Sequence, residues 1–282
     1  MKSILLPTDF SENSWNAIEY ALNYFSNTAC TFYLLHVNPL TQVTISEIDY
    51  NYSTTPILAE DLYTKPAKKK LNELLKKIAS RFSNNAKHAF YTINDTDFFI
   101  DAVRNQVKEK KIDLIVMGTK GASGLKKLII GSNTADIITK VKCNTLVIPE
   151  NAKFKALKQI AFPTDLLQFY GVTTLEPILE NLEQFKASLK IVHINKKELN
   201  LNKDQEKNKD FLEDYFSNFN HSFSFLTNTK IEAGIERFVE SKNIDMIVMI
   251  AKNLNYFQQI LFHNKVEEIS YQTDVPFLVL HE

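Results

Sequence analysis

The sequence predicts an α/β protein built from two tandem copies of one domain, each an open five-stranded parallel sheet with helices on both faces. Short apolar, β-branched segments alternate with amphipathic helical segments, which is the pattern of parallel strands joined by right-handed crossovers. Several segments of the first half return in the second half. The chain has 282 residues, which is about twice the usual length of one domain.

Four pairs of segments carry the internal repeat. They are KSILLPTDFS at 2–11 and KQIAFPTDLL at 158–167, LLHV at 34–37 and IVHI at 191–194, KIDLIVM at 111–117 and NIDMIVM at 243–249, and NTLVIPE at 144–150 and PFLVLHE at 276–282. The offset is 156 residues for the first pair (158 − 2) and 132 for the third (243 − 111). We therefore expect a first domain over 1–150, which carries a nucleotide loop, and a second, degenerate domain over 151–282.

Local patterns assign the elements of the first copy. Strands are expected at 3–6, 31–37, 87–92, 113–117 and 145–148. The first helix has a buried face formed by Ile18, Ala21, Leu22 and Phe25. Further helices are expected at about 60–82, at about 97–110 and after Ser132. The lysine run of the second helix is interpreted as a solvated face, because no aromatic residues alternate with it as on a nucleic-acid-binding surface.

Residues 113–132, DLIVMGTKGASGLKKLIIGS, are expected to form a strand, a glycine loop and the start of a helix. Glycine accepts positive φ and lets the backbone approach a ligand, and a helix N-terminus attracts anions. The spacing of Gly118, Gly121, Gly131 and Ser132 is G-x2-G-x9-G-S, which is neither a Walker loop nor G-x-G-x-x-G. We expect phosphate binding, and a plain tight turn between elements is the alternative.

Asp9, Val37 and Gly118 follow or end expected strands, so they should meet at the carboxyl edge where such sheets bind ligands. A carboxylate there can accept hydrogen bonds from an adenine amino group or a ribose hydroxyl. The alternative role for Asp9 is in a turn or a helix cap, since Ser11 is itself a good N-cap. Three lysines border the loop and either contact a polyphosphate or only add solubility: Lys120, Lys126 and Lys127.

Composition restricts the classes of partner. Lys+Arg and Asp+Glu both number 33, which gives no global charge for binding nucleic acid or an anionic membrane. Two cysteines predict a reducing compartment, and the absence of a signal peptide or an 18-residue apolar span predicts a cytoplasmic location. His36 and His193, at strand ends, should form local hydrogen bonds, so no metal site is proposed. No G-x-S-x-G elbow occurs, and no catalytic residue is assigned.

These motifs resemble the universal stress protein family in its ATP-binding subclass, through Pro7, Asp9, His36-Val37 and Met117-Gly118-x2-Gly121-x9-Gly131-Ser132. The resemblance implies a Rossmann-like fold of the adenine-nucleotide alpha-hydrolase type. It implies an adenine and ribose site, phosphates over the glycine loop, and an Mg²⁺ ion that can join the phosphates. The residues implied for nucleotide binding are Pro7, Thr8, Asp9, Val37, Met117, Gly118, Lys120, Gly121, Gly131, Ser132 and Asn133.

The resemblance also implies pairing through the last strand, so the two halves should form an internal dimer, with a homodimer as a further option. Asn144 stands where the family often has proline. In the second copy, the positions of the four loop residues hold Ile250, Asn253, His263 and Asn264. Large side chains there should keep phosphate away, so we expect no ATP binding in the usual way, although the second copy retains Pro163 and Asp165. We expect a degenerate partner that stabilises or regulates the first copy; a site for an unrelated ligand is the alternative.

The resulting hypothesis is a cytoplasmic stress-response protein that binds ATP in its first domain and uses the nucleotide state as a signal or an assembly switch. One alternative is a nucleotide-independent dimeric interaction scaffold. Another is a slow ATPase, although no residue is clearly placed to activate water.

Overall fold

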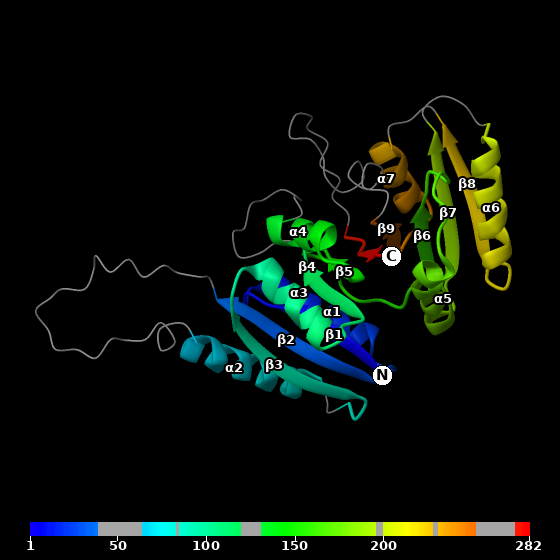
Figure 1. Cartoon of the computed structure of the whole chain (residues 1–282). Helices are drawn as coiled ribbons and strands as arrows, with labels where there is room; N and C mark the ends of the chain where they lie inside the picture. The colour runs from blue at the N-terminus through cyan, green and yellow to red at the C-terminus, as the bar shows by residue number, and fades with distance from the viewer. Residues whose placement is uncertain (39–63, 83–84, 120–130, 196–199, 228–230, 252–273) are drawn as a thin grey trace, which may run out of the picture.

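The computed structural model describes residues 1–38, 64–82, 85–119, 131–195, 200–227, 231–251 and 274–282. Strands and helices alternate through both halves (Figure 1). The first half contains β1 (Lys2–Pro7), α1 (Glu12–Tyr24), β2 (Cys30–Asn38), α2 (Lys65–Arg81), β3 (His88–Thr96), α3 (Phe99–Glu109), β4 (Leu114–Gly118), α4 (Ser132–Lys140) and β5 (Thr145–Ile148). The second contains β6 (Gln159–Pro163), α5 (Val172–Phe185), β7 (Ser188–Asn195), α6 (Lys203–Tyr215), β8 (His221–Thr227), α7 (Ile231–Ser241), β9 (Met246–Ile250) and β10 (Phe277–Leu280).

The predicted strands and helices of the first half are present, with one clear extension. Strand β3 continues to Thr96, four residues beyond the expected end, because it pairs with β2 along its whole length. The last pairs are His36 with Asn94, Val37 with Asp95 and Asn38 with Thr96.

All ten strands belong to one sheet, in the order β3-β2-β1-β4-β5-β10-β9-β6-β7-β8. Neighbours are parallel within each half, as predicted, and β5 and β10 are antiparallel. The two five-stranded sheets therefore join through their last strands. The order along the chain reverses between β1 and β4, and again between β6 and β9, so each half has a switch point.

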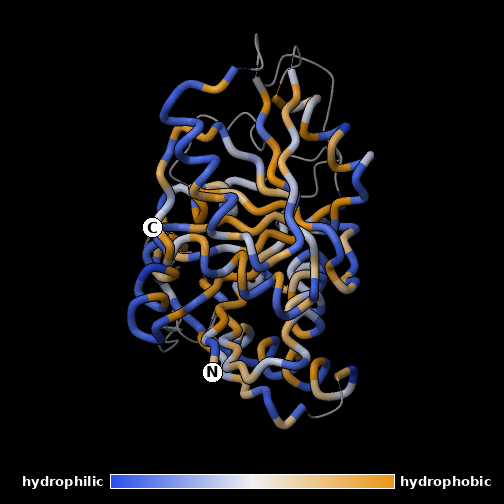
Figure 2. The backbone as a smooth tube through the Cα atoms, turned by 90° about the vertical axis from the view of Figure 1, so that its right-hand side faces the viewer, coloured by the Kyte–Doolittle hydropathy of each residue, from blue (hydrophilic) through white to orange (hydrophobic). Residues whose placement is uncertain are grey.

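Helices cover both faces of the sheet. The apolar sides of α1, α2, α5 and α6 share one continuous core that crosses from one half to the other. The other face is covered by α3, α4 and α7. Figure 2 shows hydrophobic stretches concentrated in the middle of the molecule and hydrophilic stretches on its outside. Central strands are buried on both faces, which explains why β4 and β9 read as continuous apolar runs.

The linker between the halves packs against the protein. The side-chain amide of Asn16 in α1 donates to the carbonyl oxygens of Pro149, Glu150 and Ala152 at 3.0–3.2 Å. Phe154 packs against Tyr20 with ring centroids 5.4 Å apart. In the described part of the chain, no helix combines the length and hydrophobicity needed to cross a membrane.

Candidate functional site

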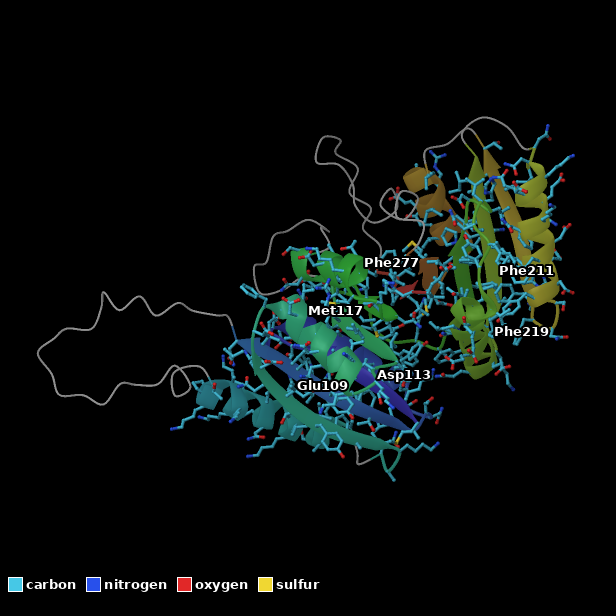
Figure 3. The ribbon with its side chains drawn as sticks, viewed as in Figure 1. Glu109, Asp113, Met117, Phe211, Phe219 and Phe277 are labelled. Carbon is cyan, nitrogen blue, oxygen red and sulfur yellow. The ribbon has the colours of Figure 1, made fainter. Side chains whose placement is uncertain are left out.

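The candidate site lies at the carboxyl edge of the first half, at its switch point. Strand β1 pairs with β2 on one side and β4 on the other, so the ends of all three strands are neighbours. In Figure 3, Asp113 precedes β4 and Met117 lies near its far end, towards α4. The structure thus brings six predicted residues to one edge, with three more at the start of α4: Pro7, Thr8, Asp9, Val37, Met117 and Gly118, then Gly131, Ser132 and Asn133. Four others lie outside the described residues: Lys120, Gly121, Lys126 and Lys127.

A tight turn follows β1. The backbone N–H of Phe10 donates to Thr8 Oγ1 at 3.0 Å, and Ser11 donates through N and Oγ to Asp9 Oδ1 at 3.0 and 2.6 Å. Ser11 then caps α1, its Oγ accepting from the N–H of Ser14 at 3.2 Å. Asp9 therefore has the role in a turn that the sequence offered as the alternative to ligand binding. A carboxylate offers about four acceptor sites, so this role is compatible with contact to a ligand.

The histidine at the end of β2 supports this turn. His36 Nδ1 lies 2.8 Å from the carbonyl oxygen of Thr8, and because a carbonyl only accepts, Nδ1 carries the proton. The His36 ring packs on Phe10, with centroids 4.4 Å apart, and Phe10 has a positive φ of 64°. His193 makes the equivalent contact with Thr164 at 3.0 Å. Both histidines are thus held by the local hydrogen bonds expected from the sequence.

Gly118 is required by close packing. A Cβ at this position would lie 3.1 Å from the carbonyl oxygen of Asn13, at the start of α1. The carbonyl oxygen of Gly118 in turn accepts from Thr134 Oγ1 at 2.9 Å, which fixes the end of β4 to the first turn of α4.

The N-terminus of α4 offers donors to an anion. Its N-cap is Gly131, which provides no side-chain cap, and Ser132 and Asn133 are exposed. The N–H groups of the first helical turn have no partner inside the helix, so they are suited to oxygen atoms of a phosphate. The N–H of Gly131 donates to the carbonyl oxygen of Thr119, which places this helix start directly over the end of β4.

The sequence analysis did not single out Thr119. Its side chain is 1% exposed, and Oγ1 has no hydrogen-bond partner within the described part of the chain. A buried hydroxyl without a partner is costly, so it is a candidate for a bond to a ligand. The available signal was its position, directly after Gly118, the last residue of an otherwise apolar strand.

Within the described ranges, no group of three or more His, Cys, Asp or Glu side chains could hold a metal ion. The hydrogen-bonding groups that the described residues place at this edge are backbone N–H donors, hydroxyls and the carboxylate of Asp9, which is an acceptor. This set fits a phosphorylated, hydroxyl-bearing ligand.

The second half repeats the turn but changes its surroundings. Leu166 N donates to Thr164 Oγ1 and Leu167 N to Asp165 Oδ1, both at 3.0 Å, and Leu166 has φ 58°. Ile250, buried at 5% exposure, stands where Gly118 stands in the first half.

The start of the helix differs as well. Helix α5 begins at Val172, whereas the repeat of α1 would begin at 168, so a turn of helix is replaced by an extended segment. Phe169, which corresponds to Asn13 of the first half, is therefore not part of a helix. Within the segment, the Tyr170 hydroxyl lies 2.8 Å from Thr164 Oγ1 in the place of Ser14. The other three substituted positions, Asn253, His263 and Asn264, lie outside the described residues.

The comparisons with known proteins agree with the fold. Residues 1–149 match the model of the universal stress protein family. A universal stress protein of Methanocaldococcus jannaschii is 26% identical over 157 residues, covering 52% of this chain and 94% of that protein. A solved universal stress protein from Archaeoglobus fulgidus has a TM-score of 0.70 at 18% identity, with 98% of this chain and 97% of that chain covered. A solved protein from Pseudomonas aeruginosa, titled a putative universal stress protein, has a TM-score of 0.62 at 13% identity, with coverages of 99% and 93%.

Two other universal stress proteins were solved with an adenine nucleotide bound. A universal stress protein family protein from Arabidopsis thaliana was solved with AMP bound, and another universal stress protein in complex with cAMP. The family model covers more than half of the chain, and the full-length structural matches extend over both halves. The chain therefore belongs to the universal stress protein family.

Proposed function

We propose that the first half, residues 1–150, binds ATP and that the nucleotide state serves as a signal or favours one assembled form. The observation that carries this proposal is the junction of β4 and α4. There, Gly118 lets the strand end pack against α1, the N-terminus of α4 lacks a side-chain cap, and the buried Thr119 hydroxyl has no partner in the described part of the chain. These features provide donors for phosphate oxygens.

The rest of the edge provides for the nucleoside. Pro7 ends β1, Thr8 and Asp9 follow it, and Val37 is near the end of β2, so an adenine and ribose would lie across the two strand ends. Met117, Ser132 and Asn133, with Lys120 and Gly121 of the loop, complete the proposed contacts. When bound, Mg²⁺ would neutralise phosphate charge, and the phosphates themselves would be its principal ligands.

We propose that the second half, residues 151–282, does not bind ATP and serves as a partner of the first half. Ile250 and the extended segment before α5 replace the glycine packing of the first half. Two buried free thiols, Cys30 and Cys143, fit a reducing compartment, and we propose a cytoplasmic location.

The experiment is to purify the chain without added nucleotide, denature it and identify any released compound by mass spectrometry, with its molar ratio. About one adenine nucleotide per chain is expected. Empty protein that also gives no heat on titration with Mg-ATP would contradict the proposal and favour the nucleotide-independent scaffold. ADP that accumulates over time would show slow hydrolysis.

The matched variants are Gly131→Val and Gly171→Val. Both glycines are N-caps with ordinary extended backbone, φ −57° and −64°, so valine strains neither. Gly131→Val should abolish ATP binding because its side chain lies where phosphate must approach, whereas Gly171→Val should not change it. Retained affinity in Gly131→Val, with the fold intact by circular dichroism, would refute the loop assignment.

A further inference from the structure

We propose that the pairing of β5 with β10 is specific for unlike halves, so that each half recognises the other in preference to a second copy of itself. The proposal rests on the two ends of this antiparallel pair, which the internal repeat makes equivalent in position. Their chemistry is not equivalent.

The first end contains a hydrogen bond between the halves. The register pairs Thr145 with Val279, Leu146 with Leu278 and Val147 with Phe277. Just beyond the first of these pairs, the backbone N–H of His281 donates to Asn144 Oδ1 at 2.9 Å. The side chain of Asn144 thus satisfies a backbone N–H group of the other half.

The second end is built from two prolines. With the offset of 132 residues, Asn144 corresponds to Pro276 and His281 corresponds to Pro149. Pro149 has no N–H to donate, and the ring of Pro276 has no acceptor. Donor and acceptor are therefore both present at one end and both absent at the other.

The backbone at the two ends is the same. Ile115 N donates to the carbonyl oxygen of Asn144 at 2.9 Å, and its repeat, Ile247 N, donates to that of Pro276 at 3.0 Å. Thr119 N donates to the carbonyl oxygen of Ile148 at 3.1 Å, and its repeat, Ala251 N, donates to the carbonyl oxygen of Leu280 at 2.8 Å. The backbone hydrogen bonds to the neighbouring strands are thus repeated at both ends, whereas the donor and acceptor across the pair are not.

Pairing of like halves would mismatch both ends. Two β5 strands would place Asn144 opposite Pro149 twice, so that the amide has no donor to accept from. Two β10 strands would place the His281 N–H opposite Pro276 twice, and this donor would lose its partner. Since an unmatched polar group at an interface costs more than a matched pair gains, unlike pairing is favoured.

Side-chain contacts between the halves outside β5 and β10 also lack a counterpart at the repeated positions. Lys2 Nζ lies 2.7 Å from Glu180 in α5, and the hydroxyl of Tyr24 donates to Asn181 Oδ1. With the offset of 156 residues, the positions of Lys2 and Glu180 correspond to Lys158 and Tyr24, which cannot form the same ion pair. A dimer of first halves would therefore lose this contact in addition to the matched strand end.

One consequence concerns assembly. Both pairing strands of the chain are occupied by each other, and a second copy could engage them only by exchanging halves. A homodimer of whole chains that forms without this exchange must therefore use a different surface.

The test is a set of full-length variants measured by urea unfolding. Asn144→Pro leaves the His281 N–H opposite a proline and should lower the folding equilibrium constant about five- to tenfold. Adding His281→Pro removes that donor, so the double variant should recover most of the loss. Both prolines already occur at the equivalent positions of the other half, Pro276 and Pro149, which makes them suitable for this backbone.

A transposed variant tests matching separately from residue identity. The four changes Asn144→Pro, Pro149→His, Pro276→Asn and His281→Pro move the donor and acceptor to the opposite end. The transposed chain should be more stable than either Asn144→Pro alone or Asn144→Pro with Pro276→Asn. Additive losses, with no recovery in the double or the transposed chain, would overturn the proposal.

Hydrogen exchange gives a reading that does not depend on global stability. The His281 amide should be protected in the wild-type chain and exchange faster in Asn144→Ala, while the amide of Ala251 keeps its protection. An unprotected His281 amide in the wild-type chain would also overturn the proposal.

Discussion

Asp245 Oδ1 lies 2.7 Å from the Nζ of Lys155, and this pair fixes the linker to the second half. The other carboxylate oxygen accepts from the backbone N–H groups of Lys158 and Gln159 at 2.8 and 3.0 Å. Burial of Asp245 opposes its ionisation, but Lys155 and the two N–H donors outweigh it, so the pKa of this carboxyl is lowered. Asp245 is therefore ionised, and its carboxylate holds both the start of β6 and the linker that precedes it.

Asp245→Asn should lower the free energy of unfolding by about 1–3 kcal/mol at pH 7, because a charged acceptor of three donors is lost. The folded-state pKa is below the ordinary value, so the carboxylate stabilises above about pH 4, and this contribution is lost as the pH falls through the folded pKa. Urea unfolding at pH 7 and pH 3 checks this. The matched control is Asp113→Asn, at the equivalent but exposed position, where one carboxylate oxygen accepts from Ser3 N at 2.7 Å. An equal loss in both variants would contradict the role of Lys155.

Gly118→Ala should destabilise the chain by about 1–2 kcal/mol, within the range for overpacking. The added Cβ would lie 3.1 Å from the carbonyl oxygen of Asn13, and this oxygen belongs to helix backbone that cannot rotate away. Thermal unfolding measures the loss. Ile250→Gly is the reciprocal change in the second half, where a buried side chain is removed, and it should destabilise through a cavity instead. An unchanged melting temperature in Gly118→Ala would show that α1 can shift.

Lys111→Gly should stabilise the chain by about 1 kcal/mol, because Lys111 has a positive φ of 49° after the end of α3, where glycine carries no Cβ penalty. The repeat already has Asn243 at φ 50°, a residue that tolerates this conformation better than lysine. Lys110→Gly is the control, since Lys110 has φ −92° and should gain nothing. Equal effects of the two changes in urea unfolding would contradict the argument from backbone strain.

His281 should make the chain less stable on mild acidification. Burial, and then the nearby charge of Lys142, lower the pKa of its imidazole. The unfolded chain therefore takes up this proton first as the pH falls, so the stability contribution is present above about pH 7 and is lost below about pH 6.5. His281→Gln keeps the backbone N–H and should flatten the change in urea midpoint between pH 8 and pH 5.5. An equal change in urea midpoint with pH in wild type and variant would exclude the His281 side chain as the source of the pH dependence.

The fold was predictable because its signals are local and repeated. Alternating apolar strands and amphipathic helices defined the elements, and the recurrence of PTD and IVM segments defined two halves with parallel strands. The extension of β3 to Thr96 was not predictable, because it depends on its pairing with β2 and not on its own, mostly polar sequence, INDT.

Part of the candidate site was also predictable, since glycines at a strand end and a helix start are visible in any sequence. The burial of the Thr119 hydroxyl, which has no partner among the described residues, and the turn role of Asp9 depend on three-dimensional neighbours. The later start of α5 is likewise not visible in the repeat pattern.

The antiparallel contact of β5 and β10 reverses strand direction at the centre of the sheet. The carboxyl ends of β5 and β10 therefore point in opposite directions where the two strands meet. The halves are also joined beside this contact, by the core that α1 and α5 share and by the ion pair of Lys2 with Glu180. Displacement of one half relative to the other would therefore disturb the strand pair and these side-chain contacts together.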